Sequence, residues 1–69
     1  MNSNEFAEAV SQIKDIESRG RAAELIGSVC YRHSDQWNWT KWYEACCILP
    51  VLIVEGNERR VGYRDASVA

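Results

Sequence analysis

Pro50 divides this chain into a helical part and a β part. Before it, apolar residues recur every three or four positions, and after it Val51-Leu52-Ile53-Val54 forms a short apolar, largely β-branched run. A proline cannot donate a backbone hydrogen bond and restricts the residue before it, so we expect a helix to stop here. Gly56-Asn57 is a two-residue turn signal, and Arg59 to Tyr63 can return as the second strand. The sequence therefore predicts a β-hairpin over residues 51–64.

The turn position also predicts the register of the hairpin. Counting outward from Gly56-Asn57, three pairs face each other across the strands: Val54 and Arg59, Leu52 and Val61, Pro50 and Tyr63. Side chains alternate between the two faces of a strand. One face is then apolar and suited to covering a helix, whereas the other carries Arg60 and Arg64.

The first predicted helix covers residues 4–19. Its apolar residues recur at helical spacing: Phe6, Ala9, Val10, Ile13 and Ile16. Asn2 followed by Glu5 three positions later has the form of a capping box, although Ser3 or Asn4 is an alternative cap. Gly20 is placed to end this helix, because glycine adopts the left-handed conformation at little cost.

Two further helices are predicted over residues 22–32 and 38–48. The apolar stripe of the first is Ala22, Leu25, Ile26, Val29 and Cys30, and that of the second is Trp39, Trp42, Cys46 and Leu49. Gly27, inside the first of these, costs about 1 kcal/mol relative to alanine and allows another helix to approach closely. Asp35 or Asn38 can cap the last helix, since both side chains accept hydrogen bonds from free N–H groups.

Length and charge limit the fold and the partners. The chain has 69 residues, with 8 Lys+Arg against 10 Asp+Glu and a net charge of -2. This length allows one domain, residues 1–69, and is too short for a barrel or a doubly wound sheet. We therefore expect an α+β fold, mostly α, with three helices followed by a C-terminal hairpin. The weak acidity argues against a general polyanion binder and against a mimic of DNA.

The three cysteines, Cys30, Cys46 and Cys47, are an odd number without the spacing of a disulfide framework. The N-terminus lacks the basic start and apolar run of a signal peptide. The longest apolar run, Ala45 to Val54, has about half of the roughly 20 residues that cross a bilayer. We expect a cytoplasmic protein with reduced thiols and no membrane partner.

The order helix, turn, helix, hairpin is that of a winged helix-turn-helix, in which the helix after the turn enters the major groove. The stretch from Trp42 to Pro50, followed by residues 55–60 and 62–64, resembles the small phage excisionases and the DNA-binding heads of MerR-type regulators. The residues that match this pattern are Trp42, Ile48, Leu49, Pro50, Gly56, Tyr63 and Arg64. The resemblance covers residues 22–68 and leaves the first helix as an addition.

The resemblance implies an accessory protein that binds and bends DNA, to direct site-specific recombination or regulate transcription. It implies double-stranded DNA as partner, with an integrase or another copy of the chain beside it. Asn38, Thr40 and Lys41 are the candidates for base edges. Arg59, Arg60 and Arg64 are the candidates for phosphates. The predicted recognition helix lacks the several arginines usual in the family, so we expect DNA binding to need several copies.

The same residues have plainer interpretations. Trp37, Trp39 and Trp42 suit a core, although Trp37 lies in the turn and, with Tyr43, is our candidate for protein contact. The arginines suit a solvated hairpin edge, and Glu55 and Glu58 beside the turn disfavour a phosphate-binding tip. Adjacent Cys46 and Cys47 are poorly spaced for zinc. We predict no metal, no cofactor and no enzyme activity, because no acid-base pair, phosphate loop or catalytic triad is visible.

A second hypothesis follows from the distribution of charge. Six of the ten acidic residues precede the third predicted helix, whereas four of the eight basic residues lie at Lys41 or beyond. The alternative function is a small phage or bacterial interaction module that inhibits a host protein by docking through its helical face.

Overall fold

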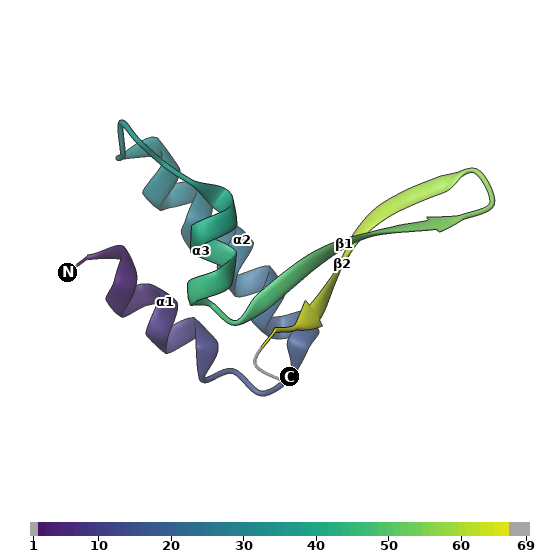
Figure 1. The fold of residues 1–69 in the computed structure, drawn as a ribbon, viewed down its shortest axis with the longest axis horizontal. Coiled ribbons are helices and arrows are strands. Elements are labelled where there is room, and N and C mark those ends of the chain that lie inside the picture. Colours follow the sequence, from purple (N-terminus) through teal and green to yellow (C-terminus); the bar gives the residue numbers. More distant parts are fainter. Residues whose placement is uncertain (1, 67–69) are drawn as a thin grey trace.

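Three helices and a two-stranded antiparallel hairpin make up the fold, which confirms the predicted α+β class. The structure is a computed structural model that describes residues 2–66. Its elements are α1 (Ser3–Ser11), α2 (Ile16–Arg32), α3 (Trp39–Ala45), β1 (Ile48–Glu55) and β2 (Glu58–Asp65). The helices pack into one body, and the hairpin projects from it (Figure 1). The molecule is accordingly elongated, with principal extents of 42 × 26 × 18 Å.

The first helix is shorter than predicted, and Gly20 does not end it. The chain leaves α1 after Ser11 and starts α2 at Ile16, because the Asp15 side chain accepts a hydrogen bond from the Ser18 N–H, 2.9 Å away. This N-cap begins a new helix in a segment whose apolar spacing had suggested one continuous helix. The capping box of Asn2 and Glu5 at the start of α1 is confirmed.

Helix α2 packs through its small residues and not through the whole predicted stripe. Gly20, Ala23 and Gly27 are buried, whereas Leu25 is 64% exposed. A Cβ atom at Gly27 would lie 2.6 Å from the Trp42 Nε1. The expectation that Gly27 allows a close approach is therefore confirmed.

The third helix ends at Ala45, earlier than predicted, and Pro50 is not what stops it. Cys47 has a φ of 60°, the left-handed conformation that commonly terminates a helix. The chain can then start β1 at Ile48, so Pro50 lies inside a strand. Asn38 is the N-cap of α3, since its Oδ1 accepts from the Lys41 N–H at 3.2 Å. Leu49, predicted on the same face as Trp42, is exposed.

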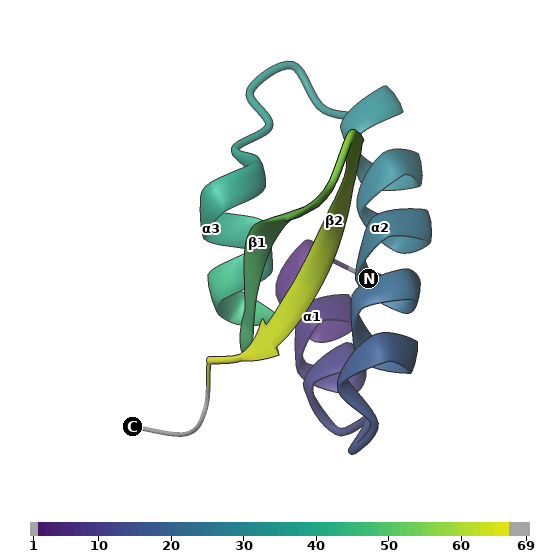
Figure 2. The same cartoon turned by 90° about the vertical axis from the view of Figure 1, so that its right-hand side faces the viewer.

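The predicted hairpin register is confirmed, although both strands are longer than expected. Leu52 faces Val61, Val54 faces Arg59, and Pro50 faces Tyr63. β1 contacts α3 and β2 contacts α2. In a view along the hairpin, its two strands lie between α3 on one side and α2 on the other (Figure 2).

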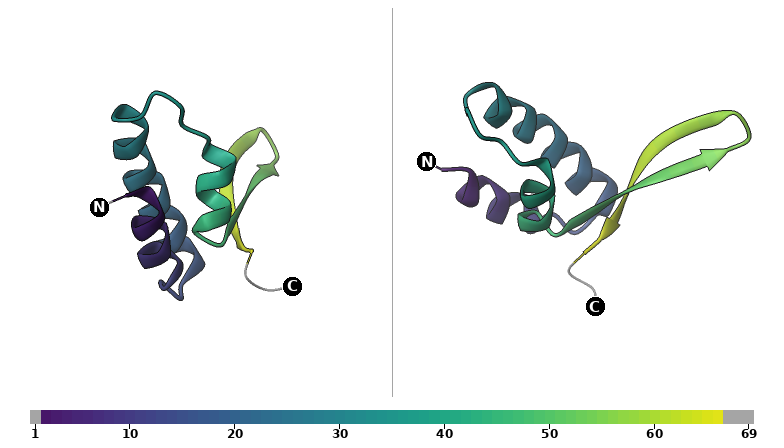
Figure 3. Two further views of the ribbon diagram at one scale, coloured as in Figure 1. Left: turned by 60° about the vertical axis from the view of Figure 1, so that its left-hand side comes forward. Right: turned by 45° about the horizontal axis from the view of Figure 1, so that its top comes forward.

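The core lies between the three helices and the base of the hairpin. Its buried members are Ala7, Val10, Ala23, Trp42, Cys46 and Ile48. The Trp42 indole is the largest of them, and its Nε1 donates to the Ala23 carbonyl at 2.9 Å. α1 contacts both α2 and α3, and Figure 3 shows it beside them with the hairpin on the far side of the body. The core role predicted for Trp42 is confirmed.

Candidate functional site: the notch between helices and hairpin

A concave surface lies where the hairpin leaves the helical body. Six residues from α2, α3 and β2 line a cavity of about 290 Å³: Glu24, Ser28, Trp39, Tyr43, Val61 and Tyr63. We call this surface the notch. Its position follows from the fold, because β2 packs against α2 at its base and diverges from the helices towards the tip (Figure 1).

A second cavity adjoins the notch along α3. Its volume is about 370 Å³, and its lining is Trp39, Thr40, Tyr43, Glu44, Ile48, Leu49 and Pro50. Trp39 and Tyr43 line both cavities, so the two form one continuous surface. Neither cavity is lined by a lysine or an arginine, whereas Glu24 lines one and Glu44 the other. The surface is therefore aromatic and acidic.

Four aromatic rings form a ladder along this surface. Tyr31 stacks on Trp39 with ring centroids 6.2 Å apart, and Trp39 stacks on Tyr43 at 5.7 Å. Tyr43 continues to Tyr63 at 6.3 Å. Such pairs contribute about 0.5–1.5 kcal/mol each beyond the area they bury. The ladder therefore holds the wall of the notch in a fixed shape.

A hydrogen bond ties the hairpin to α2 at the floor of the notch. The Tyr63 hydroxyl donates to the Glu24 carboxylate at 2.9 Å. Burial raises the pKa of Tyr63 above its usual value, and the bond to Glu24 raises it further. Burial, followed by the charge of Glu24, also raises the pKa of Tyr43. Both phenols are therefore harder to ionise in the folded protein than free tyrosine, and the Tyr63 hydroxyl is held by Glu24.

The apolar face of the hairpin does not cover a helix along its whole length, as the sequence had suggested. Tyr63 at the base packs against Gly20. Further out, Leu52 is 67% exposed, Val54 57% and Val61 61%. The reason is that the strands diverge from the helical body towards the tip. This face therefore continues the apolar wall of the notch into solvent.

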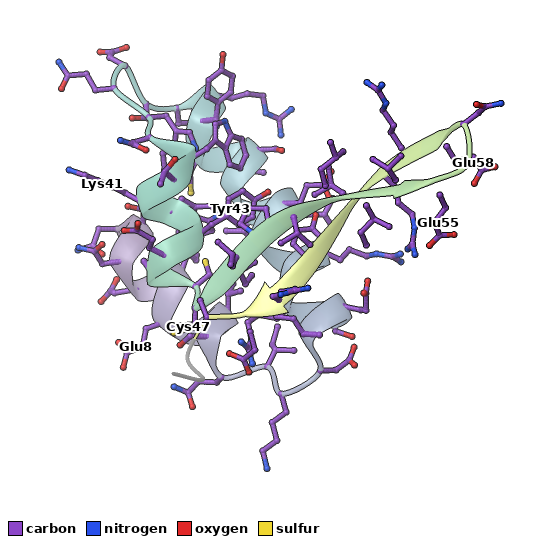
Figure 4. All side chains as sticks on the ribbon, turned by 45° about the vertical axis from the view of Figure 1, so that its right-hand side comes forward. Glu8, Lys41, Tyr43, Cys47, Glu55 and Glu58 are labelled. Atoms are coloured by element: carbon purple, nitrogen blue, oxygen red, sulfur yellow. The ribbon has the colours of Figure 1, made fainter. Side chains whose placement is uncertain are left out.

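The three predicted base-reading residues are divided between two surfaces, with Asn38 and Lys41 on one and Thr40 on the other. The Asn38 side chain is engaged as the N-cap of α3. Lys41 lines a cavity separate from the notch, together with Asn38 and with Ser3 and Asn4 of α1. It points away from the hairpin (Figure 4). Thr40 lies on the notch side.

The three predicted phosphate-binding arginines are divided between the faces of the hairpin. Arg59 faces Val54, whereas Arg60 faces Ile53 and therefore lies on the opposite face, as does Arg64, which faces Leu49. Arg60 also pairs with Glu55 at 3.1 Å. Glu55 and Glu58 face each other at the tip (Figure 4).

The predicted protein-contact residues lie in different environments. Tyr43 belongs to the notch. Trp37 is partly buried against Trp42, with centroids 5.3 Å apart, and against Trp39 at 5.7 Å. Its indole Nε1 has no hydrogen-bond partner within residues 2–66. Trp37 thus packs mainly inside the molecule.

Arg19 is a residue that the sequence interpretation missed. It is buried, and its guanidinium donates to the Ile13 carbonyl at 2.8 Å and to the Cys47 carbonyl at 3.0 Å. It also pairs with Asp65 at 2.9 Å. It thereby joins the α1–α2 turn, the α3–β1 corner and the end of β2, and fixes the angle at which the hairpin leaves the body. No local pattern marks Arg19, because two of its three partners, Cys47 and Asp65, are distant in sequence.

The thiols lie near the core. Cys30, Cys46 and Cys47 are all free. Burial, with the neighbouring thiols, raises the pKa of Cys46 to about 11. Within the described part of the chain, no three His, Cys, Asp or Glu side chains gather as a metal site would require.

The comparisons with other proteins leave the family open. The chain matches no protein-family model, no curated protein and no solved structure. The likeness to excisionases and MerR-type heads is therefore still a prediction from the residues alone. Among residues 2–66, no helix combines the length and apolarity that crossing a membrane requires.

Proposed function

We propose that this protein is a small interaction module that docks on another protein through the notch and the exposed apolar face of its hairpin. The observation that carries the proposal is the continuity of the Tyr31–Trp39–Tyr43–Tyr63 ladder with the exposed Val61 on the hairpin. Rigid aromatic side chains beside aliphatic ones are typical of the centre of a protein interface.

The electrostatics of the notch support a protein partner more than DNA. Glu24 and Glu44 border the aromatic ladder, where a nucleic acid would require cations. Lys41 points to the other side of α3. A partner with basic and apolar side chains would complement this surface.

Site-specific photo-crosslinking tests this proposal. A crosslinking amino acid at Val61 faces the notch, and one at Arg21 lies on the exposed side of α2. In the cell that makes the protein, we expect a discrete crosslinked product from position 61 and none from position 21. Equal crosslinking from both positions would contradict docking through the notch.

DNA binding is the second candidate, and the order of the elements favours it. α2, a turn, α3 and a projecting hairpin form a winged helix-turn-helix arrangement, the basis of the proposed likeness to excisionases and MerR-type heads. In this role the hairpin arginines contact phosphates of double-stranded DNA, and an integrase or another copy of the chain binds alongside. The role is that of an accessory protein in recombination or transcription.

A mobility-shift series over salt concentration tests the second candidate. Each phosphate contact lowers log K by about 0.9 per log unit of salt. Replacing Arg59, Arg60 and Arg64 together by glutamine should make log K depend less steeply on log salt concentration, by the equivalent of about three phosphate contacts. Absence of a shift at low salt, for the monomer and for higher oligomers, would rule this candidate out.

We also place the protein in the cytoplasm. The three free thiols support this assignment, because free cysteines are usual in a reducing compartment. Cell fractionation of the tagged chain tests it directly.

A further inference from the structure

The outer part of the hairpin lacks cover in the single chain. β1 and β2 contact helices at the base, and the tip extends into solvent (Figure 1). A two-stranded hairpin alone in water is marginally stable, and packing against another layer is what normally stabilises it. Leu52, Val54 and Val61 form an apolar strip on one face of this uncovered part.

The chemistry of this strip matches the notch. Arg59 lies at its outer end on the same face, opposite Val54, and makes no ion pair within residues 2–66. The notch offers aromatic side chains, and its neighbouring acids are Glu24 and Glu44. The apolar strip would pack on the aromatic wall of the notch, and Arg59 would lie near the carboxylates of Glu24 and Glu44. A hairpin cannot enter the notch of its own chain, because its base forms one wall of it.

We infer that the occupant of the notch is the hairpin of a second copy of this chain. Each copy has one notch and one uncovered hairpin. A two-fold axis, as in most homodimers, can therefore place the hairpin of each copy in the notch of the other. A standard interface buries about 800 Å² per partner, which is about one seventh of the 5429 Å² surface of this chain. The inference rests on the proposed docking role of the notch.

Sedimentation equilibrium of the full chain over a concentration series gives the first test. We expect a reversible monomer–dimer equilibrium. Leu52→Ser should weaken the dimer on the order of a hundredfold, because a two-fold interface loses each contact twice. Leu25→Ser is the matched control, since Leu25 is similarly exposed but lines neither the notch nor the adjoining cavity, and it should leave the dimer unchanged.

Charge reversal gives the second test. Arg59→Glu and Glu44→Arg should each weaken the dimer by roughly tenfold, because like charges then meet at both halves of the interface. An equimolar mixture of the two variants should dimerise better than either alone, since opposite charges meet at both halves of the mixed dimer. Arg21→Glu and Glu8→Arg repeat the two charge changes on exposed positions elsewhere and should have no effect.

Three results would overturn the inference. They are a strict monomer at all concentrations, a dimer that Leu52→Ser leaves unchanged, and a mixture of charge variants no better than its components. The dimer predicts a photo-crosslinked product of two copies from position 61, whereas a heavier product would show docking on a different protein and overturn the dimer alone. Equal crosslinking from positions 61 and 21 would contradict docking through the notch and, with it, the dimer.

Discussion

Arg19 of α2 and Asp65 at the end of β2 form an ion pair with 2.9 Å between Nη1 and Oδ1, although 46 residues separate them in the chain. The Arg19 side chain is 5% exposed and that of Asp65 32%. The pair joins the second helix to the last residue of the hairpin. It also fixes one wall of the notch relative to the other.

Arg19→Ala should lower the free energy of unfolding by about 3 kcal/mol, because breaking a buried pair strands the groups that remain. Arg19→Lys should recover only part of this loss, since an ammonium cannot reproduce the planar fork of donors. Urea unfolding measures both variants. Arg21→Ala is the control, because Arg21 lies two positions further along α2 and is exposed. An equal effect there would contradict the role of Arg19.

Gly27→Ala should destabilise the protein despite the better helix propensity of alanine. The new methyl group would lie 2.6 Å from both Trp39 and Trp42. Overpacking of this kind costs about 1–3 kcal/mol, which exceeds the gain in propensity of about 1 kcal/mol when the indoles cannot move apart. Thermal unfolding should show a lower Tm. Ser28→Ala, on the exposed neighbouring position, should leave the Tm unchanged or raise it slightly.

Cys46 should resist alkylation in the folded protein. It is fully buried, and its pKa of about 11 leaves about one molecule in a thousand as thiolate at pH 8. Iodoacetamide followed by mass spectrometry should modify Cys30 and Cys47 first. Cys46→Ala should leave the native labelling pattern unchanged and remove one label only after denaturation. Rapid labelling of Cys46 in the native state would contradict its burial.

The stability of the protein should fall at alkaline pH through Tyr63. The folded state raises the pKa of this phenol, so its contribution is complete below the unfolded value near 10 and is lost as the pH rises towards the folded value. Between pH 10 and about 11.5 the Tm of the wild type should therefore fall more steeply than that of Tyr63→Phe. Parallel curves would show that another group governs the alkaline loss.

Local sequence signals predicted what depends on neighbouring residues. The turn at Gly56-Asn57 determined the hairpin register, and the Asn2–Glu5 pattern predicted the first cap. Both are short-range effects of backbone geometry and of nearby hydrogen-bond acceptors. The helices followed from apolar periodicity, which is likewise a pattern among residues close in sequence.

Periodicity could not locate the ends of the helices. The break between α1 and α2 depends on the Asp15 cap, and the end of α3 depends on the left-handed Cys47. Apolar spacing continues across Asp15 and gives no indication of a cap there, and a non-glycine residue such as Cys47 gives no signal of a left-handed conformation. The candidate site was only partly predicted: Tyr43 was chosen for protein contact and Tyr63 for the hairpin, whereas the hydrogen bond from Tyr63 to Glu24 was not visible.

The sequence by itself determined three helices, a C-terminal hairpin and the pairing of its strands, because these depend on contacts between near neighbours. Only the tertiary structure decided where the hairpin stands relative to the helices, through Arg19 and Asp65. That angle exposes Leu52, Val54 and Val61 and separates Lys41 from the hairpin arginines. Long-range packing and a buried ion pair, rather than any local pattern, therefore created the notch.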